Sequence, residues 1–408
     1  MISKESIFRS VELTDKAQDF LKFKLGYFNS LESKKSVCPK EKLLNYFKAS
    51  DYDWNNWEWQ IKNRITQAEQ LKNLVNITEG EFNSIVKVSQ KYRWAITPYY
   101  LSQIRTFDSN DPIYLQSIPQ IMELYGDGQL DPMNEAHTNP VGIITRRYPD
   151  RVILNVTNCC ASFCRHCQRR RNIGEFDSCA SASKIDTSLT YIEEHPEIRD
   201  VLITGGDPLT LSDNSLESLL RKIRAIKTVE IVRIGTRTLV TLPQRITDGL
   251  IAILKKYRPI YINTQFNHPQ EITEDTIRAC LNLSNNGIVL GNQMVFLKGI
   301  NDNSNVLQLL NQLLLKQAVR PYYIFHPKDI IGTKHFSISI KDGLEIYNKL
   351  RGNTSGLAIP TYVFNAPQGL GKIPLSTLLL QDMEEEGKNE ISLKTWENKT
   401  VNVDLISN

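Results

Sequence analysis

An alternation of short β-rich runs with amphipathic stretches, from about residue 151 to residue 325, constrains the fold of this chain most. The expected strands are Val152–Val156, Asp200–Thr204, Val229–Ile234, Ile260–Gln265, Gly291–Phe296 and Pro321–Phe325. The expected helices between them lie near residues 184–194, 215–226, 245–256, 272–285 and 304–318. Strands that alternate with helices form parallel βα units with right-handed crossovers. Six units rather than eight predict an α/β fold with an open, partial (βα)6 barrel, which would carry its chemistry at the carboxyl ends of its strands.

The 408 residues are enough for a large core and more than one structural unit. We expect an N-terminal helical support region at 1–135, the barrel at 136–345 and a small α+β extension at 346–408. In the first part, Asp51–Ile61 is predicted to form one helix whose aromatic face, with Trp54 and Trp57, packs into the core. In the last part, Ile359–Phe364 is predicted to be one more strand, and the tail beyond 385 a small cap or a strand pair.

Composition and charge exclude several classes of protein. The net charge of +4 is too small to indicate a nucleic-acid partner. Seven cysteines in a chain of this length, three of them clustered, do not suggest a disulfide framework, so a reducing compartment is expected. The sequence has no apolar run of about 18 residues, and its first residues lack the apolar segment of a signal peptide. We therefore expect a cytoplasmic protein with no membrane segment and no nucleic-acid partner.

Three cysteines, Cys160, Cys164 and Cys167, follow the first expected strand with the spacing Cys-x3-Cys-x2-Cys. Thiolates bind iron–sulfur clusters, and a 4Fe–4S cluster held by only three of them keeps one iron open for a non-protein ligand. A zinc site is the alternative, but it needs a fourth ligand, and His166 lies between two of the cysteines, too close for easy tetrahedral closure. Cys159 would give a different spacing and is interpreted as a packing residue. The spacing favours a cluster.

Two later segments contain residues that can contact small ligands. Gly205-Gly206-Asp207 follows the second expected strand, where glycine lets a backbone come close to a ligand and the acid can accept a hydrogen bond from an ammonium. Lys372 follows Gly371 in a loop, and lysine forms Schiff bases with pyridoxal phosphate. A plain turn and a solvated lysine are the alternatives, and the residues alone leave both interpretations open.

The cysteine stretch resembles that of the radical S-adenosylmethionine enzymes, and most of the chain resembles their 2,3-aminomutase family. The similar motifs are colinear from Asp53 to about Pro374. They are Arg147-Tyr148-Pro149-Asp150-Arg151, the cysteine stretch with Arg169, Gly205-Gly206-Asp207, Phe266-Asn267-His268-Pro269, Gly291-Asn292-Gln293, Pro321-Tyr322-Tyr323 and Gly371-Lys372. The resemblance implies a partial barrel of the radical S-adenosylmethionine type, a 4Fe–4S cluster, S-adenosylmethionine and pyridoxal 5′-phosphate.

The resemblance also implies roles for individual residues and partners. Lys372 would hold pyridoxal phosphate as a Schiff base, and Arg169 would bind the α-carboxylate of an amino acid substrate. The other implied contacts are Arg147, Tyr148 and Arg151 with the cofactor phosphate, Gly205, Gly206 and Asp207 with the methionine amino group, and Gln293 with S-adenosylmethionine. An electron donor such as a flavodoxin or ferredoxin and assembly into a homo-oligomer are implied as well. The expected reaction is a radical shift of an amino group between neighbouring carbons, which is an isomerisation.

Two residues depart from the lysine-specific members of the family and bear on the substrate. Those members bind the distal ammonium of lysine with two aspartates, and the corresponding residues here are Lys328 and Asn365. A cation about 4 Å from a substrate ammonium would repel it by roughly 4 kcal/mol at an effective dielectric constant of about 20, which is about a thousandfold in binding. A carboxylate would be attracted instead, and glutamate-specific members resemble this chain at both positions. We therefore predict L-glutamate as substrate and β-glutamate as product, unless Lys328 reaches solvent and Asp329 faces the site instead.

Other functions are compatible with parts of the pattern. The same chemistry could act on lysine, arginine or a protein-bound lysine, although Lys328 and Asn365 argue against a cationic substrate side chain. A non-catalytic iron–sulfur sensor or electron carrier would need no pyridoxal phosphate, and a radical enzyme of another type would leave Lys372 unused. The last cysteine is Cys280, so the cysteine-rich zinc tail of lysine-specific members, and oligomer assembly through it, is not expected here.

Overall fold

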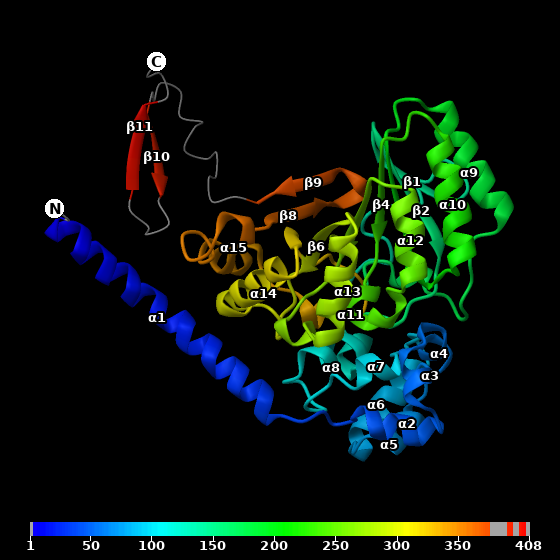
Figure 1. Ribbon diagram of the computed structural model, residues 1–408, viewed down its shortest axis with the longest axis horizontal. Helices are drawn as coiled ribbons and strands as arrows, with labels where there is room; N and C mark the ends of the chain where they lie inside the picture. The colour runs from blue at the N-terminus through cyan, green and yellow to red at the C-terminus, as the bar shows by residue number, and fades with distance from the viewer. Residues whose placement is uncertain (1–2, 376–389, 395–399, 405–408) are drawn as a thin grey trace.

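The computed structural model describes residues 3–375, 390–394 and 400–404 (Figure 1). Its centre is a nine-stranded sheet whose strands lie side by side in the order of the sequence. These strands are β1 (Ile144–Tyr148), β2 (Arg151–Thr157), β3 (Asp200–Gly205), β4 (Ile231–Gly235), β5 (Ile260–Thr264), β6 (Val289–Val295), β7 (Val319–Phe325), β8 (Thr361–Ala366) and β9 (Gly371–Pro374). A separate antiparallel pair consists of β10 (Glu390–Lys394) and β11 (Thr400–Asp404).

The sheet is parallel from β2 to β8 and antiparallel at its two edges, where β1 pairs with β2 and β9 pairs with β8. Among the described strands, β1 and β9 lie at the two ends of the strand order and do not pair with each other, so the barrel is open. The longer helices are α1 (Lys4–Ser33), α2 (Lys40–Phe47), α6 (Glu79–Ser89), α9 (Ala182–Glu194), α10 (Asp213–Ala225), α12 (Asp248–Lys256), α13 (Glu274–Asn285), α14 (Ser304–Lys316) and α15 (Ile340–Asn348). The shorter ones are α3 (Asp51–Asn55), α4 (Trp57–Lys62), α5 (Ala68–Leu74), α7 (Pro98–Leu101), α8 (Pro112–Ser117) and α11 (Thr238–Thr241).

The predicted strands and the open α/β barrel are confirmed. The six strands expected between residues 152 and 325 are β2 to β7, and the five expected helices correspond to α9, α10, α12, α13 and α14. The extra strand expected at Ile359–Phe364 is β8, and the tail contains the strand pair β10–β11. Buried residues alternate along β2 and β6, as expected for strands whose two faces meet different surroundings.

Two edge strands of the sheet were not predicted. β1 contains the polar run Arg146-Arg147-Tyr148, and it joins the sheet through long-range pairing of Ile144 opposite Leu154. β9 begins with Gly371 and ends with Pro374, two residue types that weaken strands and are tolerated at sheet edges. Both strands therefore depend on their neighbours in space, which a local pattern does not reveal.

The single helix predicted for Asp51–Ile61 is wrong. The chain forms α3 and then α4, because the side-chain oxygen of Asn56 accepts hydrogen bonds from the backbone N–H groups of Glu58 at 2.8 Å and Trp59 at 3.2 Å and starts a new helix. Trp54 is buried as expected. The guanidinium carbon of Arg245 lies 4.5 Å from the ring centre of Trp57, so this aromatic side chain also packs against the barrel region.

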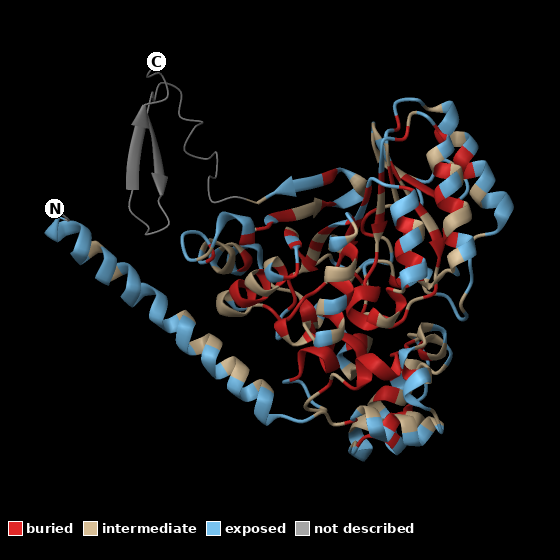
Figure 2. Cartoon of the chain, in the orientation of Figure 1, coloured by how far each residue is buried: buried red, intermediate tan, exposed pale blue. Residues whose placement is uncertain are grey.

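Helices α7 and α8 are buried along their whole length and support the loop that contains the three cysteines (Figure 2). The backbone N–H of Phe163 donates to the carbonyl of Ala95 at 3.0 Å, and that of Arg165 donates to the carbonyl of Gln116 at 2.9 Å. The N-terminal helices therefore position the cysteine loop at the carboxyl ends of the strands.

Helix α1 differs from the rest of the N-terminal region. It has no buried residue, and it extends along the outside of the molecule as a long arm (Figures 1 and 2). Neither α1 nor any other helix in the described part of the chain combines the length and the apolar character needed to cross a lipid bilayer.

Candidate active site

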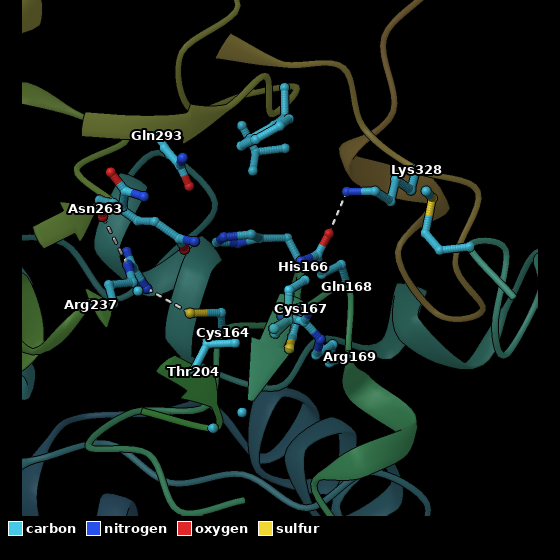
Figure 3. A pocket seen from close by; sticks show the side chains of 18 of the residues that line it. Cys164, His166, Cys167, Gln168, Arg169, Thr204, Arg237, Asn263, Gln293 and Lys328 are labelled. Carbon is cyan, nitrogen blue, oxygen red and sulfur yellow. Dashed lines mark hydrogen bonds between the residues drawn. The ribbon is translucent and has the colours of Figure 1, made fainter. Parts of the chain in front are cut away.

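One cavity at the carboxyl ends of the strands is lined by every residue that the sequence analysis assigned to a site; Figure 3 shows part of it. These residues are Arg147, Tyr148, Arg151, Cys160, Cys164, Cys167, Arg169, Gly205, Gly206, Asp207, Gln293, Lys328, Asn365 and Lys372. They come from both edges of the sheet and from the loops between them. The fold therefore brings together residues that lie more than two hundred positions apart in the sequence.

The cavity is strongly cationic. Among the described residues, seven arginine and lysine side chains line it, and Asp207 is the one acidic residue there. The seven are Arg147, Arg151, Arg169, Arg233, Arg237, Lys328 and Lys372. Such a cavity attracts ligands that carry phosphate or carboxylate groups.

The thiols of Cys160, Cys164 and Cys167 all line this cavity, whereas Cys159 is buried outside its lining. Within the described ranges, no three His, Cys, Asp or Glu side chains are grouped so that they could hold a single metal ion. Each thiolate of a 4Fe–4S cluster binds a different iron atom, so three cysteines on one loop suit three irons of such a cluster and leave the fourth iron without a protein ligand.

His166 adds unsatisfied ring nitrogens to the same cavity. Both nitrogens are buried, and neither has a hydrogen-bond partner among the described residues. Burial, together with the positive charges of Arg237 and Arg170, holds the pKa of His166 well below its usual value, so the ring is neutral at pH 7. A neutral ring with unpaired nitrogens is suited to contact a bound ligand in the cavity.

The turn after β3 packs tightly against the cysteine loop. A Cβ atom on Gly205 would collide with the carbonyl oxygen of Thr157, and a Cβ atom on Gly206 would collide with that of Cys159. Gly205 also has a φ of +132°, which favours glycine. The two glycines are therefore required for the close packing of the turn on the loop, whatever else they contact.

The carboxylate of Asp207 is engaged by the protein itself. It accepts a hydrogen bond from the Thr236 hydroxyl at 2.6 Å. It also accepts from the backbone N–H groups of Arg237 at 2.7 Å and Leu209 at 3.1 Å. Asp207 therefore connects the turn after β3 with the segment after β4, and its contact with a methionine amino group stays a prediction.

Lys372 lies on β9 with its amine inside the cavity. Its Nζ is 5.4 Å from the ring centre of Tyr148 and 5.9 Å from that of Tyr323, and its backbone N–H donates to the Tyr148 hydroxyl at 3.0 Å. Burial, followed by the charges of Arg233, Arg151 and Arg147, lowers the pKa of Lys372 to about 8. A lysine with such a pKa supplies the neutral amine that condensation with an aldehyde requires.

Three arginines converge on Glu135, a residue that the sequence analysis did not identify. Arg147 contacts its carboxylate at 2.7 Å, Arg169 at 3.0 Å and 3.2 Å, and Arg171 at 3.3 Å. Burial alone would raise the pKa of Glu135, but the arginines hold it below its usual value. The carboxylate stays ionised and orients the two arginines predicted to bind the cofactor phosphate and the substrate carboxylate.

Lys328 points into the cavity, where its ammonium donates a hydrogen bond to the side-chain oxygen of Gln168 (Figure 3). Burial and the charges of Arg169 and Arg147 lower the pKa of Lys328 to about 7. The neighbouring Asp329 is exposed and does not line the cavity. The ammonium at position 328, rather than the carboxylate at position 329, therefore faces the site.

Asn365 lies on β8 directly opposite Lys372 on β9. Its amide nitrogen is buried and has no hydrogen-bond partner among the described residues. A buried donor without a partner is costly, and a carboxylate in the cavity would satisfy it. Asn365 and Lys328 thus both offer donors, and neither offers a carboxylate.

Comparisons with known proteins identify the family. Residues 154–310 match the radical SAM superfamily, and residues 347–397 match the lysine-2,3-aminomutase family model. The glutamate 2,3-aminomutase of Clostridioides difficile is 51% identical over 401 residues, which cover 98% of this chain and 94% of that protein. The chain belongs to the 2,3-aminomutase family of radical S-adenosylmethionine enzymes. Among lysine-specific members, the L-lysine 2,3-aminomutase of Clostridium subterminale is 48% identical over 328 residues, or 80% of this chain and 79% of that protein.

Family membership confirms the predicted enzyme class and part of the chemistry. The chain is an isomerase of the radical S-adenosylmethionine superfamily, which implies a 4Fe–4S cluster and S-adenosylmethionine. The names of the relatives include both glutamate and lysine enzymes with similar identities. The family alone therefore does not identify the substrate.

Proposed function

We propose that this 2,3-aminomutase moves the α-amino group of L-glutamate from carbon 2 to carbon 3 and forms β-glutamate. The observation that supports this substrate most is the charge of the cavity. Among the described residues, its one acid is Asp207, whose carboxylate already accepts three hydrogen bonds from protein groups. A substrate with a distal ammonium would find no free carboxylate, whereas a substrate with two carboxylates would find cations for both.

The two carboxylates of glutamate would be bound by different groups. The Nε and Nη2 groups of Arg169 donate to Glu135, which holds the guanidinium in place. Arg169 would take the α-carboxylate through its remaining Nη1 and Nη2 hydrogens, which form a second pair of parallel donors. Lys328 would take the side-chain carboxylate, with its ammonium steadied by Gln168. The unpaired amide nitrogen of Asn365 would add a second donor.

The cofactors fit the residues that line the cavity. When bound, the cluster with S-adenosylmethionine would supply a 5′-deoxyadenosyl radical, and pyridoxal phosphate would supply an aldehyde that carries the migrating amino group. Cys160, Cys164 and Cys167 would each hold one iron. Lys372 would bond the aldehyde through an amine whose pKa of about 8 leaves a useful fraction neutral near pH 7.

The aldehyde cofactor also carries a phosphate, which needs cationic partners. Arg147 and Arg151 line the cavity beside Tyr148, and the guanidinium carbon of Arg151 lies 4.8 Å from the centre of the Tyr148 ring. The hydroxyl of the same tyrosine accepts the backbone N–H of Lys372. This arrangement would place the phosphate-binding arginines on β1 and β2 next to the lysine that holds the other end of the cofactor.

The test is product analysis. Reduced, reconstituted enzyme is incubated without oxygen with L-glutamate or L-lysine, and the amino acids formed are separated and identified. We expect β-glutamate from glutamate and little β-lysine from lysine. Faster isomerisation of lysine would refute the charge argument, and a protein that isomerises neither but binds a cluster would favour an electron carrier or sensor.

A further inference from the structure

The side chain of Arg237 contacts the sulfur of Cys164, one of the three cysteines expected to hold the cluster. This arginine follows β4, and its Nη1 donates a hydrogen bond to the sulfur of Cys164 at 3.0 Å (Figure 3). The side chain is buried, with 7% of its surface exposed. Neither composition nor motif spacing pointed to this residue, and the proposed reaction assigns it no task.

The guanidinium is held rigidly in this position. Its Nη2 donates to the carboxylate of Glu271 at 2.6 Å and to the side-chain oxygen of Gln116 at 2.7 Å. Its Nε donates to the carbonyl of Gln265 at 3.2 Å. With these donors engaged, Arg237 cannot turn away from Cys164 without breaking buried hydrogen bonds.

Glu271 is itself fixed. Its second carboxylate oxygen accepts the backbone N–H groups of Asn267 at 2.6 Å and His268 at 3.2 Å, and the residue is 1% exposed. The hydroxyl of Tyr100 donates to the first oxygen at 2.9 Å. Pairing with Glu271 alone would neutralise the buried charge of Arg237. The additional hydrogen bonds fix the direction of the guanidinium, so that Nη1 stays directed at the sulfur of Cys164.

We infer that Arg237 sets the reduction potential of the 4Fe–4S cluster through its hydrogen bond to the Cys164 thiolate. Reduction adds one electron to the cluster, supplied by an external one-electron donor of the flavodoxin or ferredoxin class, and no bond to a protein residue forms or breaks. A donor and a positive charge beside the thiolate stabilise the more negative, reduced cluster. Arg237 thereby makes reduction easier, as a positioning residue that acts through Cys164.

Redox titration monitored by electron paramagnetic resonance tests this inference on the cluster-loaded enzyme. Arg237→Lys keeps a positive charge beside Glu271, but a lysine cannot contact both Glu271 and the sulfur of Cys164. The midpoint potential of the cluster in this variant should therefore shift to a more negative value. Arg237→Gln, which also removes the charge, should shift it further in the same direction. The matched control is Arg245→Lys. Arg245 is also a fully buried arginine, but its partners are the carboxylate of Asp213 at 2.7 Å and the carbonyl groups of Leu209 and Leu211, not a cysteine sulfur. The midpoint potential of this variant should equal that of the wild type.

A second measurement needs no variant that might lose its cluster. In wild-type enzyme made with arginine labelled with nitrogen-15 in the guanidinium, pulsed electron paramagnetic resonance of the reduced cluster should detect a nitrogen-15 coupling. Absence of this coupling, or an Arg237→Lys enzyme with normal cluster content and an unchanged midpoint, would overturn the inference. Neither experiment uses an amino acid substrate, so an error in the proposed substrate would leave both outcomes unaffected.

Discussion

If Lys328 binds the side-chain carboxylate of glutamate as proposed, the lowered pKa of Lys328 makes the binding of glutamate depend on pH. Burial, Arg169, Arg147 and Lys372 lower this pKa to about 7, and Glu135 opposes the shift. The amine of Lys328 attracts a carboxylate only while it is protonated, so the attraction is complete well below pH 7 and is lost progressively as the pH rises through 7. A bound carboxylate raises the pKa again, so the loss falls on the free enzyme. The fraction protonated drops from about one half at pH 7 to about one hundredth at pH 9, which predicts a roughly fifty-fold rise in KM for glutamate.

Lys328→Arg isolates this effect, because a guanidinium keeps its charge over the whole range. The assay measures the KM for glutamate at intervals from pH 6.5 to pH 9 in both enzymes, by quantifying β-glutamate formed without oxygen. We expect the rise in KM above pH 7 in the wild type and its loss in Lys328→Arg, while pH effects from Lys372 and from the substrate amino group remain in both. If both enzymes show the same profile, Lys328 does not contact the substrate carboxylate.

Three further predictions concern the same cavity. Replacement of Lys328 and Asn365 together by aspartate should change the ratio of kcat/KM for lysine to that for glutamate by about a thousandfold or more, because a repulsion of roughly 4 kcal/mol becomes an attraction; an unchanged ratio in a mixed-substrate assay would mean that these residues do not contact the distal group. Lys372→Ala should keep its fold by circular dichroism and lose the visible absorbance of a Schiff base after gel filtration with pyridoxal phosphate, and retention of that band would contradict the assignment. Gln168→Leu should raise the KM for glutamate roughly tenfold with little change in kcat, because a hydrogen bond to a charged group contributes about 1.5–3 kcal/mol; an equal fall in kcat would instead indicate a disturbed cysteine loop.

The parallel core could be predicted because its signals are local. Strands β2 to β7 are short apolar runs with five amphipathic helices between them, and such periodicity is visible without knowledge of neighbours in space. The rule that chemistry collects at the carboxyl ends of parallel strands then placed the cysteine loop and Gly205-Gly206-Asp207 correctly in one cavity. The edge strand β1 was not predicted, because the sequence Arg146-Arg147-Tyr148 is typical of an exposed polar segment. It forms a strand because it pairs with β2, which is a contact in space that the local sequence does not show.

The residues missed at the site act through partners that are distant in the sequence. Glu135 lies in a turn-rich segment and gains its role from three arginines, and Gln168 gains its role from Lys328, which is 160 positions away. Arg237 follows β4 as the cysteine loop follows β2, so the same strand-end rule could have identified it. For Asp207 the motif suggested a contact with a ligand, but the carboxylate accepts hydrogen bonds from Thr236 and Arg237. A sequence motif does not reveal such contacts within the protein.

The most direct test of the account is a competition between substrates. Reduced, reconstituted wild-type enzyme receives equal concentrations of L-glutamate and L-lysine in one oxygen-free vessel, and the initial rates of β-glutamate and β-lysine formation are measured together. The cationic cavity predicts β-glutamate in large excess. Formation of β-lysine at an equal or higher rate would contradict the claim that Lys328 and Asn365 select a substrate with a second carboxylate.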